Sequence, residues 1–270
     1  LVLSRSVVAA ILLSFFNIKI FLEIHTELKG ITKFFFKISK LKKISKNIKF
    51  IFINKYLLNF FKIEKKKFII LDDAVNTELF KNKRSKIHKN TCAYFGSLTK
   101  GKGLEIILEI SKLNKNINFH IYGDLKLVFK QVDKNSYKNV KFYNHVDYYK
   151  IPKYMSRYHI LLMPYLEKVS VRSSNLDTSK YMSPLKLFEY LAMSKIIIAS
   201  KLKVYSHILK NNYNCFLLES NNLLSWIHLI ENIFKNIKKF ESLRKSALKT
   251  SRKFTWDQRV EKILFFRQNF

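Results

Sequence analysis

The chain has 270 residues, 48% of them hydrophobic, which is enough to bury one large core or two modest ones. Its formal net charge of +32 accompanies a general excess of Lys, Ile, Asn and Phe without a nucleic-acid-binding motif, so we expect no nucleic acid as partner. The longest apolar run, Val7 to Phe16, is shorter than the roughly 18 to 20 residues of a membrane span, and two Cys in strand-like contexts predict reduced thiols in a cytoplasmic protein.

Strand and helix patterns alternate in the first part of the chain, residues 1–80. The expected strands are Val2–Arg5, Lys19–Ile24, Ile48–Ile53 and Phe68–Leu71, and the expected helices are Ser6–Phe16, Glu27 to about Lys43, and Lys55–Phe61. This alternation predicts a parallel, doubly wound α/β sheet. Because the pattern opens on a strand with no Met before it, we expect the first domain to lack its opening units. The polar, basic residues 81–90 are interpreted as a linker.

The alternation repeats in residues 91–251, which we expect to form a second domain. The expected strands are Cys92–Phe95, Asn118–Tyr122, Val140–Tyr143, His159–Met163, a run ending at Ser200, and Cys215–Leu218. One expected helix follows Gly103 and ends at about Leu113. The others are Asp147–Arg157, Val204–Lys210, Leu223–Phe234 and Phe240–Ser251. A long polar loop, Leu166–Tyr181, precedes a further helix, and loops of this length are usually functional. Thr255 is the expected N-cap of a terminal helix in residues 252–270.

The most informative stretch is Lys180 to Ser200. Ser183 is a good N-cap and Pro184 fits the first helical position. Leu185, Phe188, Leu191 and Ala192 recur at helical spacing as a buried stripe, and Lys186 and Glu189 are expected near the exposed end of the helix. A helix N-terminus favours a phosphate ligand, and Glu189 one turn further could accept hydroxyl hydrogen bonds. The alternative is an ordinary capped helix.

A second informative stretch is the Gly-rich turn Gly96 to Gly103, which follows an expected strand. Three of the five Gly of the chain lie in these eight residues, together with Lys102. A backbone that approaches a phosphate needs Gly, and a nearby Lys neutralises charge. Gly-rich turns after strands are common, so the turn alone is a weak signal.

The run S-P-L-K-L-F-E-Y, residues 183–190, resembles the donor-site motif of the family-4 GT-B glycosyltransferases, which are retaining and use nucleotide sugars. In that family two Glu are separated by seven residues; Glu189 matches the second, which holds the ribose hydroxyls, and Tyr181 stands at the first. The Gly-rich turn resembles the family's G-R-L-x-x-x-K-G, with Ser97 where an Arg usually grips the diphosphate. The donor-binding residues that the resemblance implies are Gly96, Ser97, Lys102, Gly123, Ser183, Pro184, Leu185, Lys186 and Glu189.

The resemblance covers nearly the whole chain and implies a GT-B fold, with two Rossmann-like domains facing a cleft. Residues 72–80 resemble the family's segment D-G-V-D-x-x-x-F, and Phe254-Thr255-Trp256 resembles the terminal F-(S/T)-W helix that crosses back onto the first domain. It also implies a metal-independent transfer, with a nucleotide-diphosphate sugar as donor substrate and no other cofactor. Lys102 and the helix N-terminus would stabilise the leaving diphosphate.

The candidate catalytic residues lie at the ends of two strands in the first part of the chain. His25 follows the strand Lys19–Ile24, and Arg5 ends the strand before it. In family relatives a His that approaches the transferred sugar often stands where this chain has Arg5, so His25 and Arg5 are the candidates. The alternative is that His25 is structural, as a lone His at a strand end often is.

The segment from Lys33 to Lys67 has twelve Lys and a single Glu, interleaved with Phe and Ile. Such a segment can lie on an anionic membrane surface. A solvated helix face whose Lys content follows the overall composition explains the same pattern.

Three functions are therefore considered. The first is a sugar transferase of polysaccharide biosynthesis that acts on a glycan or lipid-linked acceptor, cytoplasmic and peripheral at the inner membrane face. The second is a truncated or decayed relative that binds nucleotide sugar without catalysis, suggested by the missing start, by Ser97, and by Asn144 and Ser194 where the family prefers Gly. The third is a basic membrane- or nucleic-acid-binding protein with an α/β core.

Overall fold

The computed structural model describes residues 1–39, 44, 46–127, 132, 136–171 and 174–268. The chain folds into two compact units. The first contains Leu1–Ala74, Lys180–Ser183 and Trp256–Phe270, and the second contains Val75–Ser179 and Pro184–Thr255. Within the described ranges, no helix is both long enough and apolar enough to cross a membrane.

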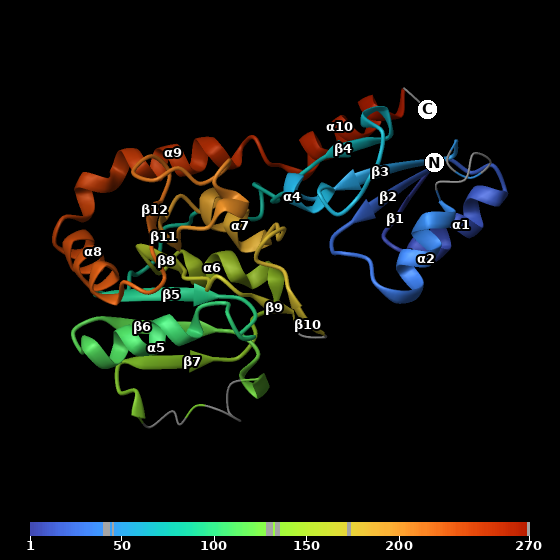
Figure 1. Cartoon of the computed structure of the whole chain (residues 1–270). Coiled ribbons are helices and arrows are strands. Elements are labelled where there is room, and N and C mark those ends of the chain that lie inside the picture. The colour runs from blue at the N-terminus through green and yellow to red at the C-terminus, as the bar shows by residue number, and fades with distance from the viewer. Residues whose placement is uncertain (40–43, 45, 128–131, 133–135, 172–173, 269–270) are drawn as a thin grey trace. The chain divides into compact units, whose positions relative to one another are not determined.

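A parallel sheet of four strands, in the order β1-β2-β3-β4, forms the centre of the first unit (Figure 1). The strands are β1 (Val2–Ser4), β2 (Ile20–Ile24), β3 (Ile48–Phe52) and β4 (Phe68–Ile70). The helical elements are α1 (Val7–Phe15), α2 (Gly30–Ile38), α4 (Lys55–Leu58), the 3-10 turn η1 (Lys65–Lys67) and α10 (Trp256–Arg267). β2 and β3 are buried along their whole length, as mostly apolar runs predict for central parallel strands, although each contains one charged residue, Glu23 and Lys49.

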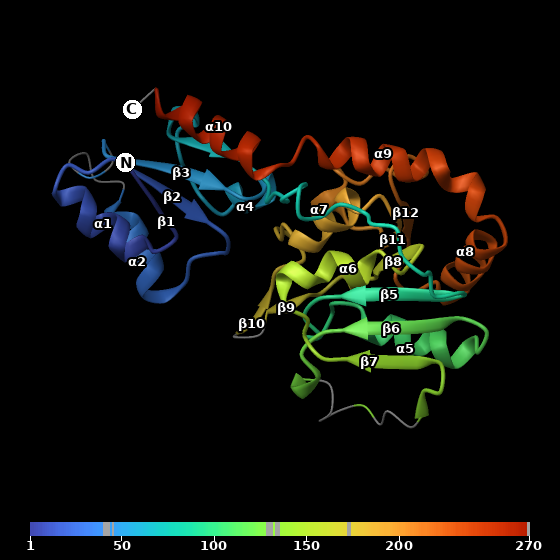
Figure 2. The ribbon, with the colours of Figure 1, turned by 180° about the vertical axis from the view of Figure 1, so that it is seen from behind.

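Helices cover both faces of this sheet (Figures 1 and 2). Side chains of α1 and α2, such as Ala10 and Phe36, pack with Ile20 and its neighbours on one face. On the other face Phe21 packs with Ile263 of α10, because successive residues of a strand point to opposite faces. The terminal helix therefore completes the core of the first unit.

The second unit contains a parallel sheet of six strands in the order β12-β11-β8-β5-β6-β7. Its strands are β5 (Thr91–Phe95), β6 (Asn118–Tyr122), β7 (Val140–Tyr143), β8 (Ile160–Met163), β11 (Ile196–Ser200) and β12 (Phe216–Leu218), and β9 (Ser170–Val171) and β10 (Ser174–Asp177) form a separate antiparallel pair. Its helices are α5 (Leu104–Leu113), α6 (Ile151–Met155), α7 (Leu185–Ala192), α8 (Leu223–Lys235) and α9 (Glu241–Ser251), with 3-10 turns η2 (Leu125–Leu127), η4 (Tyr148–Lys150), η5 (Lys203–Tyr205) and η6 (Ile237–Phe240).

The order of the strands in this sheet reverses between β5 and β8. Strands β6 and β7 follow β5 on one side, and β8, β11 and β12 extend the sheet on the other. In open parallel sheets, ligands bind beyond the carboxyl ends of the strands at such a reversal. α5 and α8 pack against one face of the sheet through Ile107, Ile230 and their neighbours. Figures 1 and 2 show α5 on one side of the sheet and α6 on the other.

The start of α7 differs from the prediction. Pro184, not Ser183, occupies the N-cap position, with an extended backbone and no side-chain cap. The Ser183 hydroxyl instead accepts a hydrogen bond of 2.9 Å from the Asp73 backbone N–H. The prediction of Ser183 as N-cap and Pro184 as first helical residue was therefore wrong by one position, because Ser183 serves a partner distant in sequence.

The buried face of α7 also differs from the prediction. Leu185 is 46% exposed, whereas Lys186 and Glu189 are only 9% and 8% exposed. Phe188 and Leu191 are fully buried as expected. Hydrophobic spacing places a charged residue on the surface by default. It fails here because Lys186 lies against the rings of Tyr94 and Tyr165, and Glu189 is near enough to the buried Tyr165 and Tyr190 for its charge to add to the rise in pKa that burial causes in both.

Several other segments are shorter or more irregular than predicted. The expected loop Leu166–Tyr181 contains the pair β9 and β10. The expected helix Val204–Lys210 is only the 3-10 turn η5, and the expected helix Asp147–Arg157 is η4 followed by α6. α2 begins at Gly30 instead of Glu27 and ends at Ile38, and residues 40–43 of the expected helix lie outside the described residues. Propensity sets element type better than element ends.

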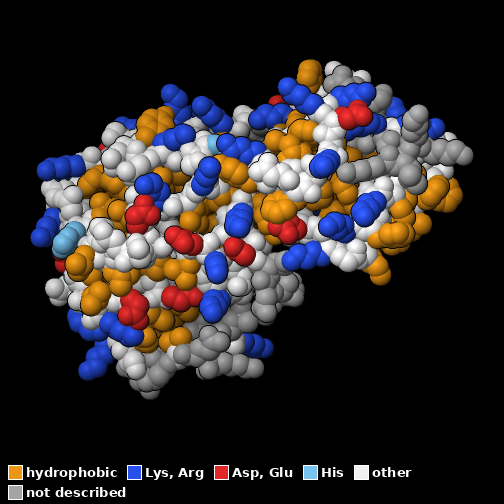
Figure 3. Space-filling model, viewed as in Figure 1, with side chains coloured by type: hydrophobic (Ala, Val, Ile, Leu, Met, Phe, Trp, Pro, Cys, Tyr) orange, Lys and Arg blue, Asp and Glu red, His pale blue; other side chains and the backbone are white. Residues whose placement is uncertain are grey.

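The segment Lys33–Lys67 does not form one basic surface. It includes α2, the buried strand β3 and α4, while residues 40–43 and 45 lie outside the described part. Lys49 is buried in β3, and its amine donates a hydrogen bond of 3.1 Å to the Phe266 backbone O. On the face shown in Figure 3, Lys and Arg side chains are scattered over the molecule. That distribution fits a general compositional excess.

Candidate functional site

The Gly-rich turn after β5 is held by close backbone packing. The Gly96 N–H donates a hydrogen bond of 3.0 Å to the Tyr122 O at the end of β6, and the Tyr94 hydroxyl closes the turn with a bond of 2.8 Å to the Ser97 O. A Cβ on Gly123 would lie 2.5 Å from the Gly96 O, so the turns after β5 and β6 touch only because Gly123 has no side chain. The backbone of the turns after β5 and β6 is therefore held in place by hydrogen bonds, and neither Gly96 nor Gly123 adds a side chain to it.

Lys186 lies directly against this turn. A Cβ on Gly96 would lie 2.6 Å from the Lys186 Nζ, and Gly96 has a φ of +138°, which a side chain rarely adopts. The Lys186 Nζ stands 3.7 Å from the centre of the Tyr94 ring and 5.3 Å from that of Tyr165. Gly96 therefore creates the space in which a lysine amine meets the turn.

The Lys186 amine is buried and has no hydrogen-bond partner among the described residues. Burial first, and then the charge of Lys102, lower the pKa of Lys186 well below its usual value, against the attraction of Glu189. Burial also lowers the pKa of Lys102. An unpaired buried amine is costly, and a hydrogen-bonded anion is the group that would relieve that cost.

Glu189 is one turn further along α7 and is the carboxylate nearest in sequence to Lys186. Burial raises the pKa of Glu189 to about 7, and the charge of Lys186 partly opposes this rise. Near neutral pH the carboxyl therefore exchanges between its protonated and ionised forms. In either form its oxygens can accept hydrogen bonds from ligand hydroxyls.

Other residues hold α7 and the turn in register. The Tyr190 hydroxyl accepts a hydrogen bond of 2.9 Å from the Phe95 N–H, which ties α7 to the carboxyl end of β5. The Ser170 N–H donates to the Lys100 O at 3.1 Å, and the Thr99 hydroxyl donates to the Ser170 O at 3.2 Å. The Gly-rich turn is therefore supported from α7 and from β9.

The structure brings together most of the residues predicted to bind the donor. Gly96, Lys102, Gly123, Lys186 and Glu189 lie around the ends of β5 and β6 and the start of α7. The Ser97 O accepts the bond from Tyr94, and the Ser97 hydroxyl lies 3.4 Å from that of Thr99. Two predicted residues differ in setting: Ser183 binds the Asp73 N–H, and the Leu185 side chain is exposed.

His25 and Arg5 meet at one buried carboxylate in the first unit. His25 follows β2 and Arg5 follows β1, the neighbouring parallel strand. The His25 Nε2 is hydrogen-bonded to the Glu23 Oε1, and the Arg5 guanidinium lies 3.4 Å from the same oxygen. The strand-end placement is as predicted, but Glu23 holds both side chains.

Arg259 of α10 completes this cluster. Its guanidinium forms an ion pair of 3.2 Å with the Glu23 Oε2 and donates to the Asp72 O at 3.0 Å. Burial alone would raise the pKa of Glu23, but the His25 hydrogen bond and the charges of Arg259 and Arg5 outweigh it and lower that pKa to about 2. Glu23 is thus an ionised hub at neutral pH.

The sequence did not single out Tyr94, Glu23 or Arg259. Tyr94 belongs to an apolar strand pattern, and nothing in that pattern indicates a ring under a lysine amine. Glu23 stands inside a buried strand, and a charged residue within such a run is the one signal that could have revealed the cluster. Among the described residues, no three His, Cys, Asp or Glu side chains are grouped as metal ligands would be.

A family model described as glycosyl transferases group 1 matches residues 75–250. An uncharacterised glycosyltransferase of Methanocaldococcus jannaschii is 24% identical over 217 residues, which are 78% of this chain and 57% of that protein. The chain thus spans little more than half the length of this curated relative.

Solved structures show the same fold. Anabaena HepE in complex with UDP superposes with a TM-score of 0.76 at 14% identity, over 98% of this chain and 76% of that one. Sucrose-phosphate synthase from Thermosynechococcus elongatus gives 0.72 at 14% identity, over 95% of this chain and 69% of that one. A Rickettsia africae glycosyltransferase gives 0.69 at 15% identity, over 98% and 80%. The two parallel sheets match the GT-B architecture of these proteins.

Proposed function

The chain belongs to the group 1 glycosyl transferases, and on this premise we propose that it moves a sugar from a nucleotide-diphosphate sugar to a glycan or lipid-linked acceptor. The single observation that best supports this proposal is the Lys186 amine, which is buried beside Gly96 with no hydrogen-bond partner among the described residues. A diphosphate at the turn would supply the missing acceptor.

The diphosphate would be bound by two amines and by the start of α7. Lys102 and Lys186 are close enough for the charge of one to lower the pKa of the other. Each would gain a charge-assisted hydrogen bond of about 1.5–3 kcal/mol from an anion. The N-terminal end of α7 adds a partial positive charge. Ser97 stands where the family usually has an Arg that binds the diphosphate. We propose that Lys186 supplies the positive charge that this Arg would otherwise provide.

Glu189 would accept hydrogen bonds from the ribose hydroxyls. Its place one turn from Lys186 suits a nucleoside on the same side as the diphosphate. The Anabaena structures were solved with UDP and with UDP-glucose, so UDP-sugars are the first donors to test.

The transfer would retain the anomeric configuration, as the resemblance of the α7 motif to the family-4 enzymes implies. The candidates for the reacting centre stay His25 and Arg5. Both contact Glu23, and the pKa of Glu23 near 2 keeps a negative charge beside them at neutral pH. Release of the leaving diphosphate would be assisted by Lys102 and Lys186.

Calorimetric titration with UDP and GDP tests the donor site. Lys102→Ala and Glu189→Ala should each weaken binding by about 1–3 kcal/mol, or roughly fivefold to 150-fold. Lys100→Ala is the matched control, because Lys100 lies in the same turn with an exposed side chain and should leave the affinity unchanged. Unchanged affinity in both site variants would refute the assignment.

Catalysis is tested separately from binding. A panel of UDP- and GDP-sugars is incubated with the chain and a mixture of glycan and lipid-linked acceptors, and released nucleoside diphosphate is measured. Release that depends on an acceptor supports the transferase. Donor binding without release would instead favour the alternative, a relative that binds nucleotide sugar without catalysis, which Ser97, Asn144 and Ser194 suggested.

The acceptor side is proposed to lie at an anionic membrane surface through α2. Ile31 and Phe34 of this helix are 73% and 61% exposed, and Lys33 and Lys37 flank them. Co-sedimentation with vesicles should then require anionic lipid, weaken with salt, and be lost in Ile31→Asn/Phe34→Asn. Equal binding to neutral vesicles would contradict this placement.

A further inference from the structure

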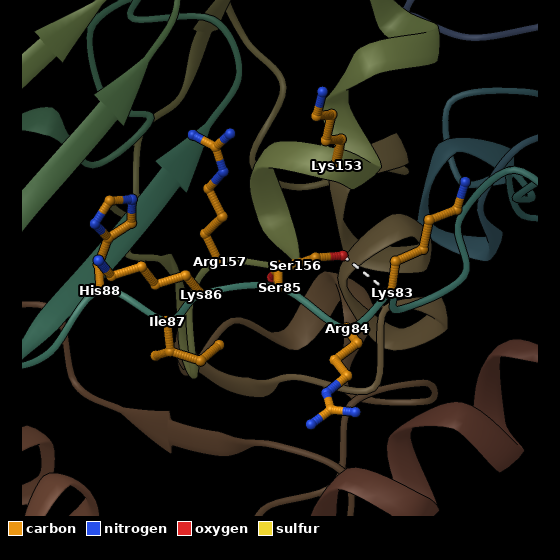
Figure 4. A pocket seen from close by; sticks show the side chains of 9 residues that line it. All are labelled: Lys83, Arg84, Ser85, Lys86, Ile87, His88, Lys153, Ser156 and Arg157. Carbon is orange, nitrogen blue, oxygen red and sulfur yellow. Dashed lines mark hydrogen bonds between the residues drawn. The ribbon is translucent and has the colours of Figure 1, made fainter.

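A second basic site lies in the second unit, at the amino ends of β5 and β8, whereas the Gly-rich turn follows the carboxyl end of β5. Residues 83–88 run beside the end of α6 and enclose a pocket of about 720 Å³. The residues that line it are Lys83, Arg84, Ser85, Lys86, Ile87, His88, Lys153, Ser156 and Arg157 (Figure 4). Five of these carry a full positive charge, and none carries a carboxylate.

The backbone of this segment is fixed at both ends. The Lys83 N–H donates a hydrogen bond of 3.1 Å to the Ser156 hydroxyl, and the His88 N–H donates one of 2.9 Å to the Arg157 O. The Ser156 hydroxyl in turn donates to the Pro152 O at 2.9 Å. Residues 83–88 therefore form an arch whose two ends are hydrogen-bonded to the residues that follow α6. These bonds fix the backbone that lines the pocket.

The pocket lies at the opposite end of the strands from the candidate donor site. His88 comes just before β5 and Arg157 comes just before β8, so both stand at the amino ends of these parallel strands. Gly96 follows the carboxyl end of β5. A ligand in this pocket is therefore distinct from a donor at the Gly-rich turn.

Three of the long basic side chains leave the arch on one side. In Figure 4 the side chains of Lys83, Lys153 and Arg157 extend to the same side of the arch. The Arg157 guanidinium is stacked 5.0 Å from the centre of the Tyr154 ring, which limits its freedom. The Ser85 hydroxyl at the arch is buried and has no hydrogen-bond partner among the described residues. A bound anion would lie among the positive charges that line the pocket and could accept a hydrogen bond from the Ser85 hydroxyl.

We propose that this pocket binds a ligand with more than one phosphate group. Arginine guanidinium groups match phosphate oxygens in pairs, and the lysines add point charges around them. The volume lies within the roughly 300–1,000 Å³ of small-molecule sites, far more than one phosphate ion fills. The ligand is either a soluble diphosphate compound or the phosphate headgroups of lipids, which share this chemistry.

The ionisation of His88 gives a local signal of binding. Burial first, and then the charges of Arg157, Lys141 and Lys86, lower the pKa of His88, and its ring packs on those of His120 and Tyr158. An anion among these charges should raise that pKa. The His88 ring resonance, assigned by its loss in His88→Gln, should therefore titrate at higher pH when inorganic diphosphate is present.

The binding test uses inorganic diphosphate and the full chain. Lys83→Gln/Lys153→Gln should weaken diphosphate binding about tenfold or more in calorimetry. The control Lys89→Gln/Lys150→Gln removes the same charge from exposed lysines of the same two segments outside the pocket, and should change affinity less than about twofold. All four side chains are exposed, so folding should be preserved.

The source of the phosphate and the identity of the site are resolved by two further measurements. Vesicles of phosphatidylcholine mixed with phosphatidylglycerol are compared with pure phosphatidylcholine in an Ile31→Asn/Phe34→Asn background, which removes the contribution proposed for α2. Anionic-vesicle binding that persists there and is lost in the pocket variant but not in the control variant assigns lipid headgroups, and diphosphate binding alone assigns a soluble ligand. Lys102→Ala should leave the His88 response to diphosphate intact. Equal weakening in pocket and control variants, a response lost in Lys102→Ala, or no pocket-dependent binding of either probe would overturn the proposal.

Discussion

Replacing Lys186 by Met should stabilise the second unit while destroying nucleotide binding. The amine is buried without a hydrogen-bond partner among the described residues, and its burial lowers its pKa well below the usual value. Substituting buried charges by apolar groups of similar size often stabilises by about 1–4 kcal/mol, and a gain of about 2 kcal/mol raises Tm by roughly 4–8 °C in a unit of this size. A Met thioether would also pack well on the Tyr94 ring.

Tryptophan fluorescence isolates this unit. Trp226 is fully buried there, and in a Trp256→Phe background it is the one remaining Trp of the chain. The stability gain of Lys186→Met should shrink as the pH rises toward about 10. Because the pKa of Lys186 is lowered in the folded state, the unfolded chain binds more protons than the folded chain between that pKa and about 10, so the wild type becomes more stable as the pH rises. UDP at about 100 times its Kd should stabilise only the wild type, by about 2.7 kcal/mol.

Lys249→Met is the control, since Lys249 is exposed on α9 and its loss should change neither stability nor UDP binding. A Lys186→Met protein that is less stable than the wild type would show that the buried amine is not destabilising, and unchanged affinity for UDP would show that the amine does not bind it.

Three further predictions concern the glycine, the carboxylates and pH. Gly96→Ala should weaken UDP binding and destabilise the second unit, because its Cβ would lie 2.6 Å from the Lys186 Nζ. Gly30→Ala is the control in thermal melts: Gly30 also has a positive φ, but no atom lies within 4 Å of the new Cβ, so this variant shows the cost of backbone strain without a close contact. Glu189→Gln should gain stability over the wild type as pH rises from about 4.5 through 7, by about 2–3 kcal/mol, because a raised pKa means that ionisation destabilises the folded state. Arg259→Ala should lower the free energy of unfolding of the first unit by about 3 kcal/mol in urea, because it leaves Glu23 poorly paired. Arg267→Ala, on the exposed side of the same helix, should lower it little. Because the pKa of Glu23 is near 2, the loss in Arg259→Ala should be full above about pH 4.5 and shrink below it. A flat pH profile for Glu189→Gln, or equal losses for the two Arg variants, would contradict these expectations.

The sheets could be predicted from the sequence because continuous apolar runs determine buried parallel strands. Asn118–Tyr122 and Val140–Tyr143 are strands with the predicted ends, and most other strands differ by one residue. The ends of helices were less predictable, since they depend on partners far along the chain. Ser183 is the clear case, because a distant backbone N–H takes the hydroxyl that local propensity assigns to capping.

The candidate site was predictable where a motif fixed the residues, and not where burial decides their state. Lys102, Lys186 and Glu189 were identified from their motifs, but the spacing of Lys186 and Glu189 predicted the exposed end of a helix. Only the packing of Tyr94 and Gly96 shows that the Lys186 amine is enclosed. The cluster at Glu23 was missed for a related reason, since its partner Arg259 lies 236 positions away in the chain.

Ser194 shows how a departure from the expected residue is accommodated. Its φ of +52° lies in the left-handed region that favours Gly. The Ser194 hydroxyl donates a hydrogen bond of 3.0 Å to the Arg244 O, and the Arg244 Nε donates one of 3.0 Å back to the Ser194 O. These bonds offset the strain, so the substitution of Gly here does not by itself indicate a decayed fold.

We propose that the Lys186 amine binds the diphosphate of a nucleotide sugar at the Gly-rich turn. A crystal structure of the chain with bound UDP tests it most directly. We expect the diphosphate within hydrogen-bond distance of the amines of both Lys186 and Lys102, and the ribose hydroxyls within hydrogen-bond distance of Glu189. A UDP molecule bound with its diphosphate elsewhere, while the Lys186 amine stays over the Tyr94 ring without a phosphate partner, would exclude this role for Lys186.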